Sequence, residues 1–116
     1  MDSIETQLRM EILKKIKDVT KKDENGNMFK INYANPKNRE FLIKNNLGLE
    51  DVKNIVLGLD VKECFDGPEA DRNSKYSGSV LEFDSRFEDE RIYTKLRYES
   101  EQKTVCMSIH EYGLYK

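Results

Sequence analysis

The sequence predicts an α+β fold in which N-terminal helices pack on one face of a small twisted antiparallel sheet. Apolar residues in the first half recur at helical spacing, whereas those in the last third alternate with a period of two. The chain has 116 residues, which is close to the commonest domain size and leaves room for one core. We therefore expect a single domain over residues 1–116.

The first element is a helix over about residues 3–22. Its apolar residues form a single stripe of Ile4, Leu8, Ile12, Leu13, Ile16 and Val19. Asp2, with Glu5 three positions later, fits a capping box, and Asn25-Gly26 interrupts the chain after the helix. This pattern predicts an amphipathic helix.

A short strand and a second helix are expected next. Residues 28–33 alternate as a strand, and Asn35-Pro36 is typical of a helix start, with asparagine as the cap and proline at the first position. The helix is expected to stop near Asn45-Asn46.

The middle of the chain predicts one more helix and then a loop. The helix covers about residues 50–58, and Asp60 followed by Glu63 indicates a cap and a short helical turn that ends at Phe65. Residues 67–79 are polar and lack apolar periodicity, so we expect a long loop, which in compact domains is commonly functional.

Three strands are expected at the end, over roughly residues 80–87, 91–98 and 104–110. Their register follows if the apolar faces coincide. The expected pairs in the last hairpin are Tyr93–His110, Lys95–Ser108 and Arg97–Cys106. The expected pairs in the preceding hairpin are Asp84–Lys95 and Glu82–Arg97.

One face of this sheet is expected to be polar, and its members are Glu82, Asp84, Arg86, Tyr93, Lys95, Arg97, Ser108 and His110. Cleavage of RNA without a metal needs a base for the 2′-hydroxyl, an acid for the leaving oxygen and positive charge around the phosphorane. His110 suits either proton role, and Lys95, Arg97 and Arg86 suit the charge role. Tyr93 is suited to donate a hydrogen bond or to stack on a base.

The same polar face has a simpler explanation. Most antiparallel sheets have one solvated side, and cross-strand ion pairs there are ordinary surface stabilisation. The composition of the face therefore leaves catalysis as one interpretation and a solvated surface as another.

Charge is unevenly distributed along the chain, although the net charge is only -2. Residues 9–53 hold 11 basic and 7 acidic side chains, for a net of +4, whereas residues 60–90 hold 4 and 10, for a net of -6. The total excludes a uniformly basic RNA binder, but it leaves room for a local cationic site around Lys95 and Arg97. The acidic segment predicts a surface for a protein partner.

The N-terminus shows no signal peptide, and no run of about 20 apolar residues predicts a membrane span, so a cytoplasmic location is expected. Cys64 and Cys106 lack CxxC spacing and are expected to be free thiols. Neither a zinc signature nor a nucleotide-binding motif occurs, and we expect no metal and no small-molecule cofactor.

The order of several motifs resembles the MqsR family of type II toxin–antitoxin toxins, a branch of the RelE-like, barnase-related ribonuclease fold. The motifs are L-G-L-E-D-V-K-N-I-V-L-G-L (47–59), D-G-P-E-A-D-R (66–72), V-L-E-F (80–83), I-Y-T-K-L (92–96) and C-M-S-I-H-E (106–111). The resemblance covers about residues 8–116. It implies a metal-independent endoribonuclease that cleaves single-stranded mRNA in the cytoplasm and is held inactive by a cognate antitoxin protein.

The resemblance also implies roles for individual residues. Tyr93 and Lys95 match the Y-x-K strand of the family, and His110 lies at the strand end where many relatives have S-F-H. Glu82 occupies the place of a glutamine, and Asp66 falls where the better-known branch has a loop lysine. The implied catalytic residues are His110, Tyr93, Lys95 and Glu82. The implied RNA contacts are Arg97, Arg72, Arg86 and Lys75.

Two other classes of function remain open from the sequence. One is a non-catalytic inhibitor or regulator on the same fold, of the kind that phages and mobile elements encode, which would bind a protein through its charged surface. The other is a small domain whose polar face does no chemistry.

Overall fold

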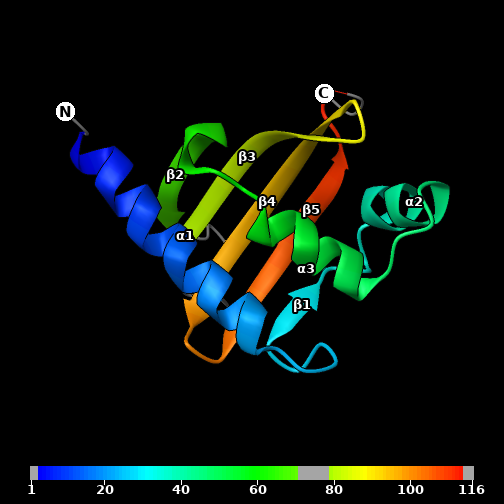
Figure 1. Cartoon of the computed structure of the whole chain (residues 1–116), viewed down its shortest axis with the longest axis horizontal. Helices are drawn as coiled ribbons and strands as arrows, with labels where there is room; N and C mark the ends of the chain where they lie inside the picture. The colour runs from blue at the N-terminus through cyan, green and yellow to red at the C-terminus, as the bar shows by residue number, and fades with distance from the viewer. Residues whose placement is uncertain (1–2, 71–78, 114–116) are drawn as a thin grey trace.

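The computed structural model describes residues 3–70 and 79–113, and in these ranges it has an α+β architecture (Figure 1). The elements in chain order are α1 (Ile4–Lys22), β1 (Phe29–Ile31), α2 (Pro36–Lys44), α3 (Leu49–Leu57), the 3-10 turn η1 (Val61–Glu63), β2 (Cys64–Ala70), β3 (Ser79–Phe87), β4 (Glu90–Ser100) and β5 (Lys103–Glu111). They form one five-stranded sheet in the order β1-β5-β4-β3-β2. All neighbours are antiparallel except β1 and β5, which are parallel, so the sheet is mixed and not purely antiparallel.

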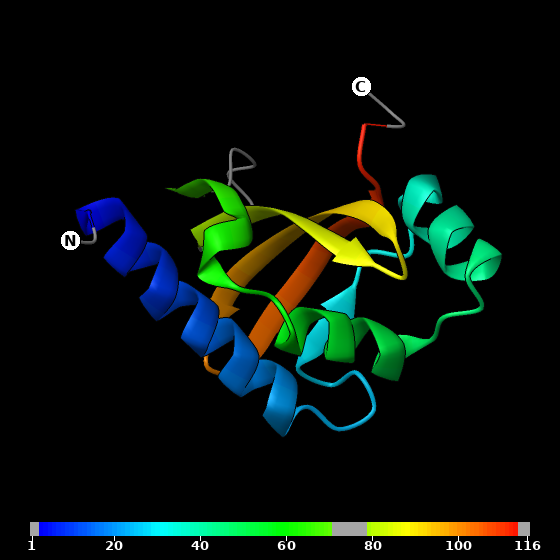
Figure 2. The same ribbon diagram turned by 45° about the horizontal axis from the view of Figure 1, so that its top comes forward.

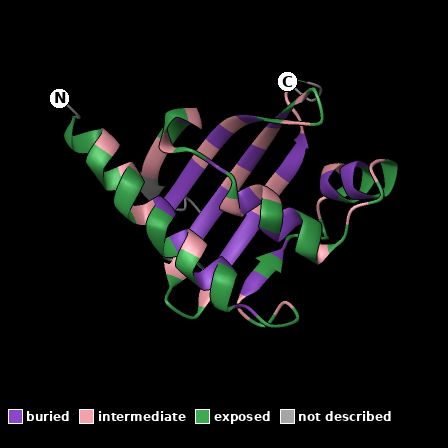
Figure 3. Ribbon diagram, viewed as in Figure 1, coloured by how far each residue is buried: buried purple, intermediate pink, exposed green. Residues whose placement is uncertain are grey.

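Helices α1 and α3 cover one face of the sheet, and α2 lies beside the end of β5 (Figures 1 and 2). The core fills the space between these layers, and buried positions run along the central strands β3, β4 and β5 (Figure 3). Ile16, Val52, Phe83 and Leu96 are among its fully buried members. The opposite face of the sheet, which we call the open face, carries no helix in the described part of the chain. No described helix is long and apolar enough to span a membrane.

Helix α1 differs from its prediction at the N-terminus. Its cap is Ser3, whose hydroxyl accepts the backbone N–H of Thr6, and not Asp2. Ile16 and Val19 of the predicted stripe are buried, but Ile4 is 78% exposed. The first turns project beyond β2 (Figure 1), so the apolar pattern there has no sheet to cover.

The predicted capping signals of the next elements are confirmed. Asn35 accepts the backbone N–H of Lys37 at the start of α2, and Asp60 accepts that of Lys62 at the start of η1. The turn η1 ends at Glu63 and does not reach Phe65.

Strand β2 was not predicted, because the sequence analysis assigned its residues to a helical turn and a loop. The strand pairs with β3 through two register shifts, so it lacks the alternation that marks the other strands. Gly67 has a φ of 99°, and a Cβ at this position would lie 2.2 Å from the carbonyl oxygen of Val80. Arg9 of α1 holds the irregular strand by donating to the carbonyls of Gly67 and Cys64 at 2.6 and 3.2 Å. The rest of the predicted loop, residues 71–78, lies outside the described residues.

The register of β3 against β4 differs from the prediction by two residues. Glu82 lies opposite Lys95 and not Arg97, and Asp84 lies opposite Tyr93 and not Lys95. The reason is a two-residue turn at Glu88-Asp89, where both residues have positive φ, so that Phe87 pairs with Glu90. The polar side chains still share the open face, because a shift of two preserves the alternation.

The pairing of β4 with β5 was predicted correctly at one end only. Tyr93 lies opposite His110 and Lys95 opposite Ser108, as expected, but Arg97 lies opposite Val105 and not Cys106. A bulge at Met107 separates the two registers, since β5 carries one extra residue there.

The bulge also turns the Cys106 side chain into the core. Cys106 and Cys64 are both buried free thiols, as predicted. Burial raises the pKa of Cys106 to about 12, and burial likewise raises the pKa of Cys64. Both thiols therefore stay protonated and unreactive near neutral pH.

A buried ion pair joins the end of α1 to α3. The Asp23 side chain is fully buried and accepts the backbone N–H groups of Gly26, Met28 and Phe29. The Lys53 ammonium lies 3.0 Å from the Asp23 carboxylate. Burial opposes ionisation of Asp23, but these hydrogen bonds outweigh it and lower its pKa to about 2.

The depressed pKa predicts acid-sensitive stability. Because the Asp23 pKa falls from 3.8 to about 2 on folding, its stabilisation is present above about pH 4 and is lost as the pH falls towards 2. The shift corresponds to about 2 kcal/mol of unfolding free energy. Urea unfolding between pH 5 and pH 2 measures this loss. In Asp23→Asn the unfolding free energy should fall less steeply with decreasing pH over that window. If the unfolding free energy of Asp23→Asn depends on pH as steeply as that of wild type, Asp23 is not the source of the acid sensitivity.

Candidate active site

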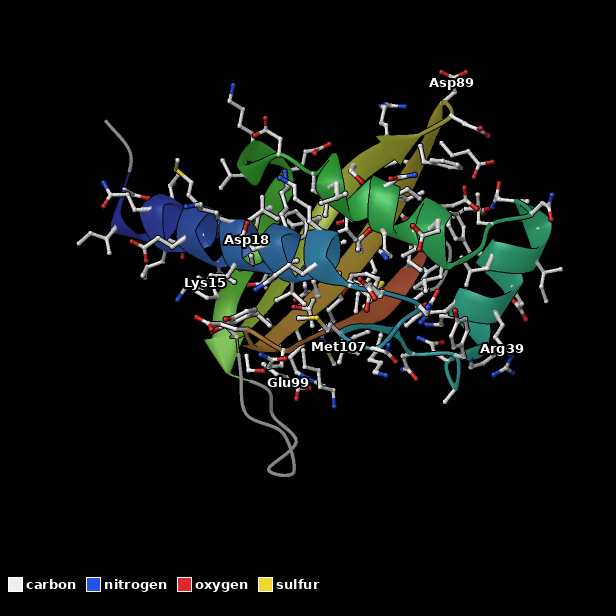
Figure 4. All side chains as sticks on the ribbon, turned by 60° about the horizontal axis from the view of Figure 1, so that its bottom comes forward. Lys15, Asp18, Arg39, Asp89, Glu99 and Met107 are labelled. Carbon is white, nitrogen blue, oxygen red and sulfur yellow. The ribbon has the colours of Figure 1, made fainter. Side chains whose placement is uncertain are left out.

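The predicted catalytic side chains meet on the open face of the sheet. Figure 4 shows the two layers, with Asp18 in the helical layer and Glu99 and Met107 on the strands. A pocket of about 370 Å³ opens there, and the residues that line it include Lys37, Tyr93, Lys95, Ser108, His110 and Tyr112. The strands supply the floor of the pocket and the start of α2 supplies one wall.

Tyr93 and Glu82 form a hydrogen-bonded pair across β4 and β3. The phenol hydroxyl of Tyr93 donates to Oε1 of Glu82. Burial, and next the hydrogen bond to Glu82, raise the pKa of Tyr93 far above its ordinary value of 10.0. Tyr93 is therefore a hydrogen-bond donor at neutral pH and cannot act as a base.

Glu82 has a second carboxyl group beside it. Asp66 of β2 pairs with Glu82 of β3 in the sheet, at the position where the family resemblance places a lysine in the better-known branch. Burial raises the pKa of Glu82 and the hydrogen bond with Asp66 adds to this rise, while the hydrogen bond from Tyr93 and the charge of Lys95 oppose it. Glu82 consequently holds a proton to higher pH than an ordinary glutamate.

Removing the Asp66 carboxyl is expected to lower the Glu82 pKa. In Asp66→Asn the neighbouring carboxyl is gone, so the charged form of Glu82 becomes easier to reach. An NMR titration of the Glu82 side-chain carboxyl measures its midpoint in both proteins. Asp84→Asn is the control, since Asp84 lies on the same strand and face but forms its ion pair with Arg91. A midpoint that does not move in Asp66→Asn would show that the carboxyl pair does not set the Glu82 pKa.

His110 is nearly buried, at 9% exposed, at the end of β5. Its Nδ1 lies 3.0 Å from the carbonyl oxygen of Glu111, so the hydrogen bond requires the proton on Nδ1. In the neutral ring the basic lone pair is then on Nε2. The His110 and Tyr93 rings are neighbours, with centroids 5.2 Å apart. The His110 ring therefore lies beside the Tyr93 ring, whose hydroxyl is hydrogen-bonded to Glu82.

The predicted cationic residues are only partly brought together. Lys95 lines the pocket directly opposite Glu82. Arg97 shares the face but is 6% exposed and forms an ion pair with Glu99, with its Nη2 2.6 Å from the carboxylate. Arg86 is exposed and lies opposite Arg91, away from the residues that line the pocket. Arg72 and Lys75 lie outside the described residues.

The sequence analysis missed the contribution of α2 to the pocket. Asn35, the helix cap, and Lys37 in the first turn both line it. The helix is held there by fully buried Asn38, whose amide donates to the Asn32 and Met107 carbonyls at 2.9 and 3.0 Å and accepts the Ile109 N–H at 2.8 Å. The Asn35-Pro36 signal located the helix start, but no local pattern indicated that the β5 bulge would bind Asn38.

The comparisons with known proteins add no relative. No protein-family model matches the sequence. No curated protein and no solved structure matches it. The resemblance to the MqsR family therefore stays a prediction from sequence motifs.

The site contains the groups for proton transfer and anion binding but not a set of metal ligands. Within residues 3–70 and 79–113, no group of three or more histidine, cysteine, aspartate or glutamate side chains is placed to hold a metal ion. The described chemistry consists of one imidazole, a carboxyl with a raised pKa, a protonated phenol and the Lys95 and Lys37 ammonium groups.

Proposed function

We propose that this protein is a metal-independent endoribonuclease that cleaves single-stranded mRNA, acting in the cytoplasm as the toxin of a type II toxin–antitoxin pair. The observation that carries the proposal is the pocket in which His110, Tyr93 and Lys95 meet the first turn of α2. An imidazole and a second proton-transfer group around an anion-binding pocket are the requirements of RNA cleavage through the 2′-hydroxyl.

In the proposed reaction, His110 Nε2 takes the proton of the 2′-hydroxyl, and the 2′-oxygen attacks the adjacent phosphorus. The bond from phosphorus to the 5′-oxygen breaks, and the products are a 2′,3′-cyclic phosphate and a free 5′-hydroxyl. Protonated Glu82 supplies the leaving-group proton directly from its carboxyl group, while the Tyr93 hydroxyl donates a hydrogen bond to its Oε1. Lys95 and Lys37 stabilise the charge that develops on the phosphorane oxygens.

The decisive test is cleavage by the purified wild-type protein in the presence of EDTA. A labelled single-stranded RNA should be cut to fragments that end in 2′,3′-cyclic phosphate, and the matching DNA, which lacks the 2′-hydroxyl, should stay intact. Expression without an antitoxin should slow growth, and co-expression of the protein encoded by the adjacent gene should relieve it. Intact RNA and normal growth together would overturn the proposal.

A protein-binding regulator is the second candidate, and a separate surface favours it. A pocket of about 420 Å³ lies between α3 and the end of β3, and its polar lining includes the acidic residues Asp51, Glu63 and Glu88. Arg97 also forms an ion pair with Glu99, so the cationic surface available to RNA is smaller than the sequence predicted. A tight protein partner whose affinity does not change in Tyr93→Phe or His110→Ala would favour this function.

A further inference from the structure

An aromatic cluster adjoins the pocket on the open face, and one of its members is not used by the proposed chemistry. The Phe65 ring lies 6.2 Å from the Tyr93 ring and 5.9 Å from the Tyr112 ring, centroid to centroid. Tyr93 and Tyr112 are themselves 6.1 Å apart, and the Arg91 guanidinium stacks 4.0 Å from the Tyr112 ring centre. Phe65 therefore lies next to two residues that line the pocket, Tyr93 and Tyr112.

Phe65 is exposed although its side chain is a large apolar ring. Its neighbour Cys64 on β2 is buried in the core, whereas Phe65 lies at the register shift between Cys64 and Asp66 and its ring is next to that of Tyr93. The Phe65 side chain is left 46% exposed beside Tyr93. A large aromatic ring that is half exposed at the rim of a cationic pocket has the surroundings of a stacking platform.

We infer that Phe65 is a base-stacking residue, on which an unpaired nucleobase of a single-stranded substrate lies while its phosphate occupies the pocket at Lys95 and Lys37. The inference rests on the proposed function and narrows its substrate to a strand with unstacked bases. In a duplex the bases are already stacked on one another, so their faces are not available to Phe65. Because any base can stack on an aromatic ring, Phe65 contributes affinity for the strand and not specificity for its base sequence.

The test separates base contacts from phosphate contacts by using two DNA oligonucleotides, which this chemistry cannot cleave. One is a fluorescent single strand of mixed sequence, and the other has the same length but carries abasic tetrahydrofuran residues in place of nucleosides. Their affinities are measured by anisotropy for wild type, Phe65→Ala, Phe65→Trp and the control Ile4→Ala, which removes an apolar side chain from α1 that is more exposed than Phe65.

Phe65→Ala should weaken binding of the intact strand by roughly 5- to 150-fold and leave binding of the abasic strand unchanged. Phe65→Trp should retain the wild-type affinity, and Ile4→Ala should not differ from wild type. Equal losses on both strands, no loss on either, or no binding of the intact strand by wild type would each overturn the inference.

The outcomes also separate this inference from the proposed function. If wild type cleaves RNA but Phe65→Ala binds the intact DNA normally, the ribonuclease proposal stands and the stacking role of Phe65 is wrong. If base-dependent binding requires Phe65 but no RNA is cleaved, the stacking surface stands and the ribonuclease proposal is wrong.

Discussion

His110→Ala is expected to reduce the rate of RNA cleavage by roughly 10²- to 10⁴-fold, which is the usual contribution of a positioned general acid or base. The variant removes the only imidazole of the chain. Lys95, Lys37 and the Tyr93–Glu82 pair remain, so binding of RNA should be largely retained. The rate is measured under single-turnover conditions with saturating protein, which reports the chemical step and not binding.

A structural role for His110 must be distinguished from a chemical one. The side chain is nearly buried, so His110→Ala is compared with wild type by circular dichroism and thermal unfolding. Added imidazole should restore part of the activity of His110→Ala, because a free imidazole enters the space left by the ring. The exposed substitution Glu11→Gln on α1 is the control and should keep full activity. Wild-type cleavage by His110→Ala would remove this residue from the mechanism.

Lys53→Met is expected to destabilise the fold by about 3–5 kcal/mol, the usual effect of removing one partner from a buried ion pair. The substitution keeps most of the side-chain volume but leaves the fully buried Asp23 carboxylate without its cation. Lys53 also donates to the Asp23 backbone carbonyl at 3.1 Å, and that bond is lost as well. Glu50, the other carboxylate near Lys53, is mostly exposed and adds little.

Equilibrium urea unfolding measures this effect, with Lys62→Met as the matched control. Lys62 is exposed in η1, and its replacement should change the unfolding free energy by less than about 0.5 kcal/mol. The double variant Asp23→Asn with Lys53→Met should lose less than the sum of the single losses, since it leaves no uncompensated charge. Equal losses in Lys53→Met and Lys62→Met would show that the ion pair does not stabilise the fold.

The carboxyl pair changes the interpretation of one departure from the family pattern. In the sequence, the resemblance implied only that Asp66 stands where the better-known branch has a cation. In the fold it lies beside Glu82 and helps to raise the Glu82 pKa, so Glu82 keeps its proton to a higher pH than an ordinary glutamate. Under the proposed function, an aspartate at this position removes a charge for binding phosphate but favours the protonated form of Glu82 that acid catalysis requires.

Arg97 illustrates why a shared sheet face does not by itself define a site. Its position on β4 was predicted by alternation, and it does lie on the open face. Its charge is nevertheless directed to Glu99, two residues further along the same strand, at 2.6 Å. Alternation assigns a side chain to a face, but the partner it finds there depends on the register and twist of the sheet.

The sequence by itself determined the elements that depend on local interactions. The helices and the three long strands follow from apolar periodicity, and Asn35 and Asp60 were recognisable as caps because a cap acts within three residues of itself. Alternation within each strand, together with the requirement that the apolar faces of neighbouring strands coincide, also placed Tyr93, Lys95 and His110 on one face.

Only the tertiary structure decided the features that join distant segments. The edge strand β2 brings Phe65 and Asp66 to the open face, although its own alternation is interrupted around Gly67. The bulge in β5 exposes backbone groups that Asn38 binds, and this contact positions the first turn of α2 at the pocket. These contacts connect residues far apart in the chain, so their geometry depends on packing and register, which no local pattern encodes.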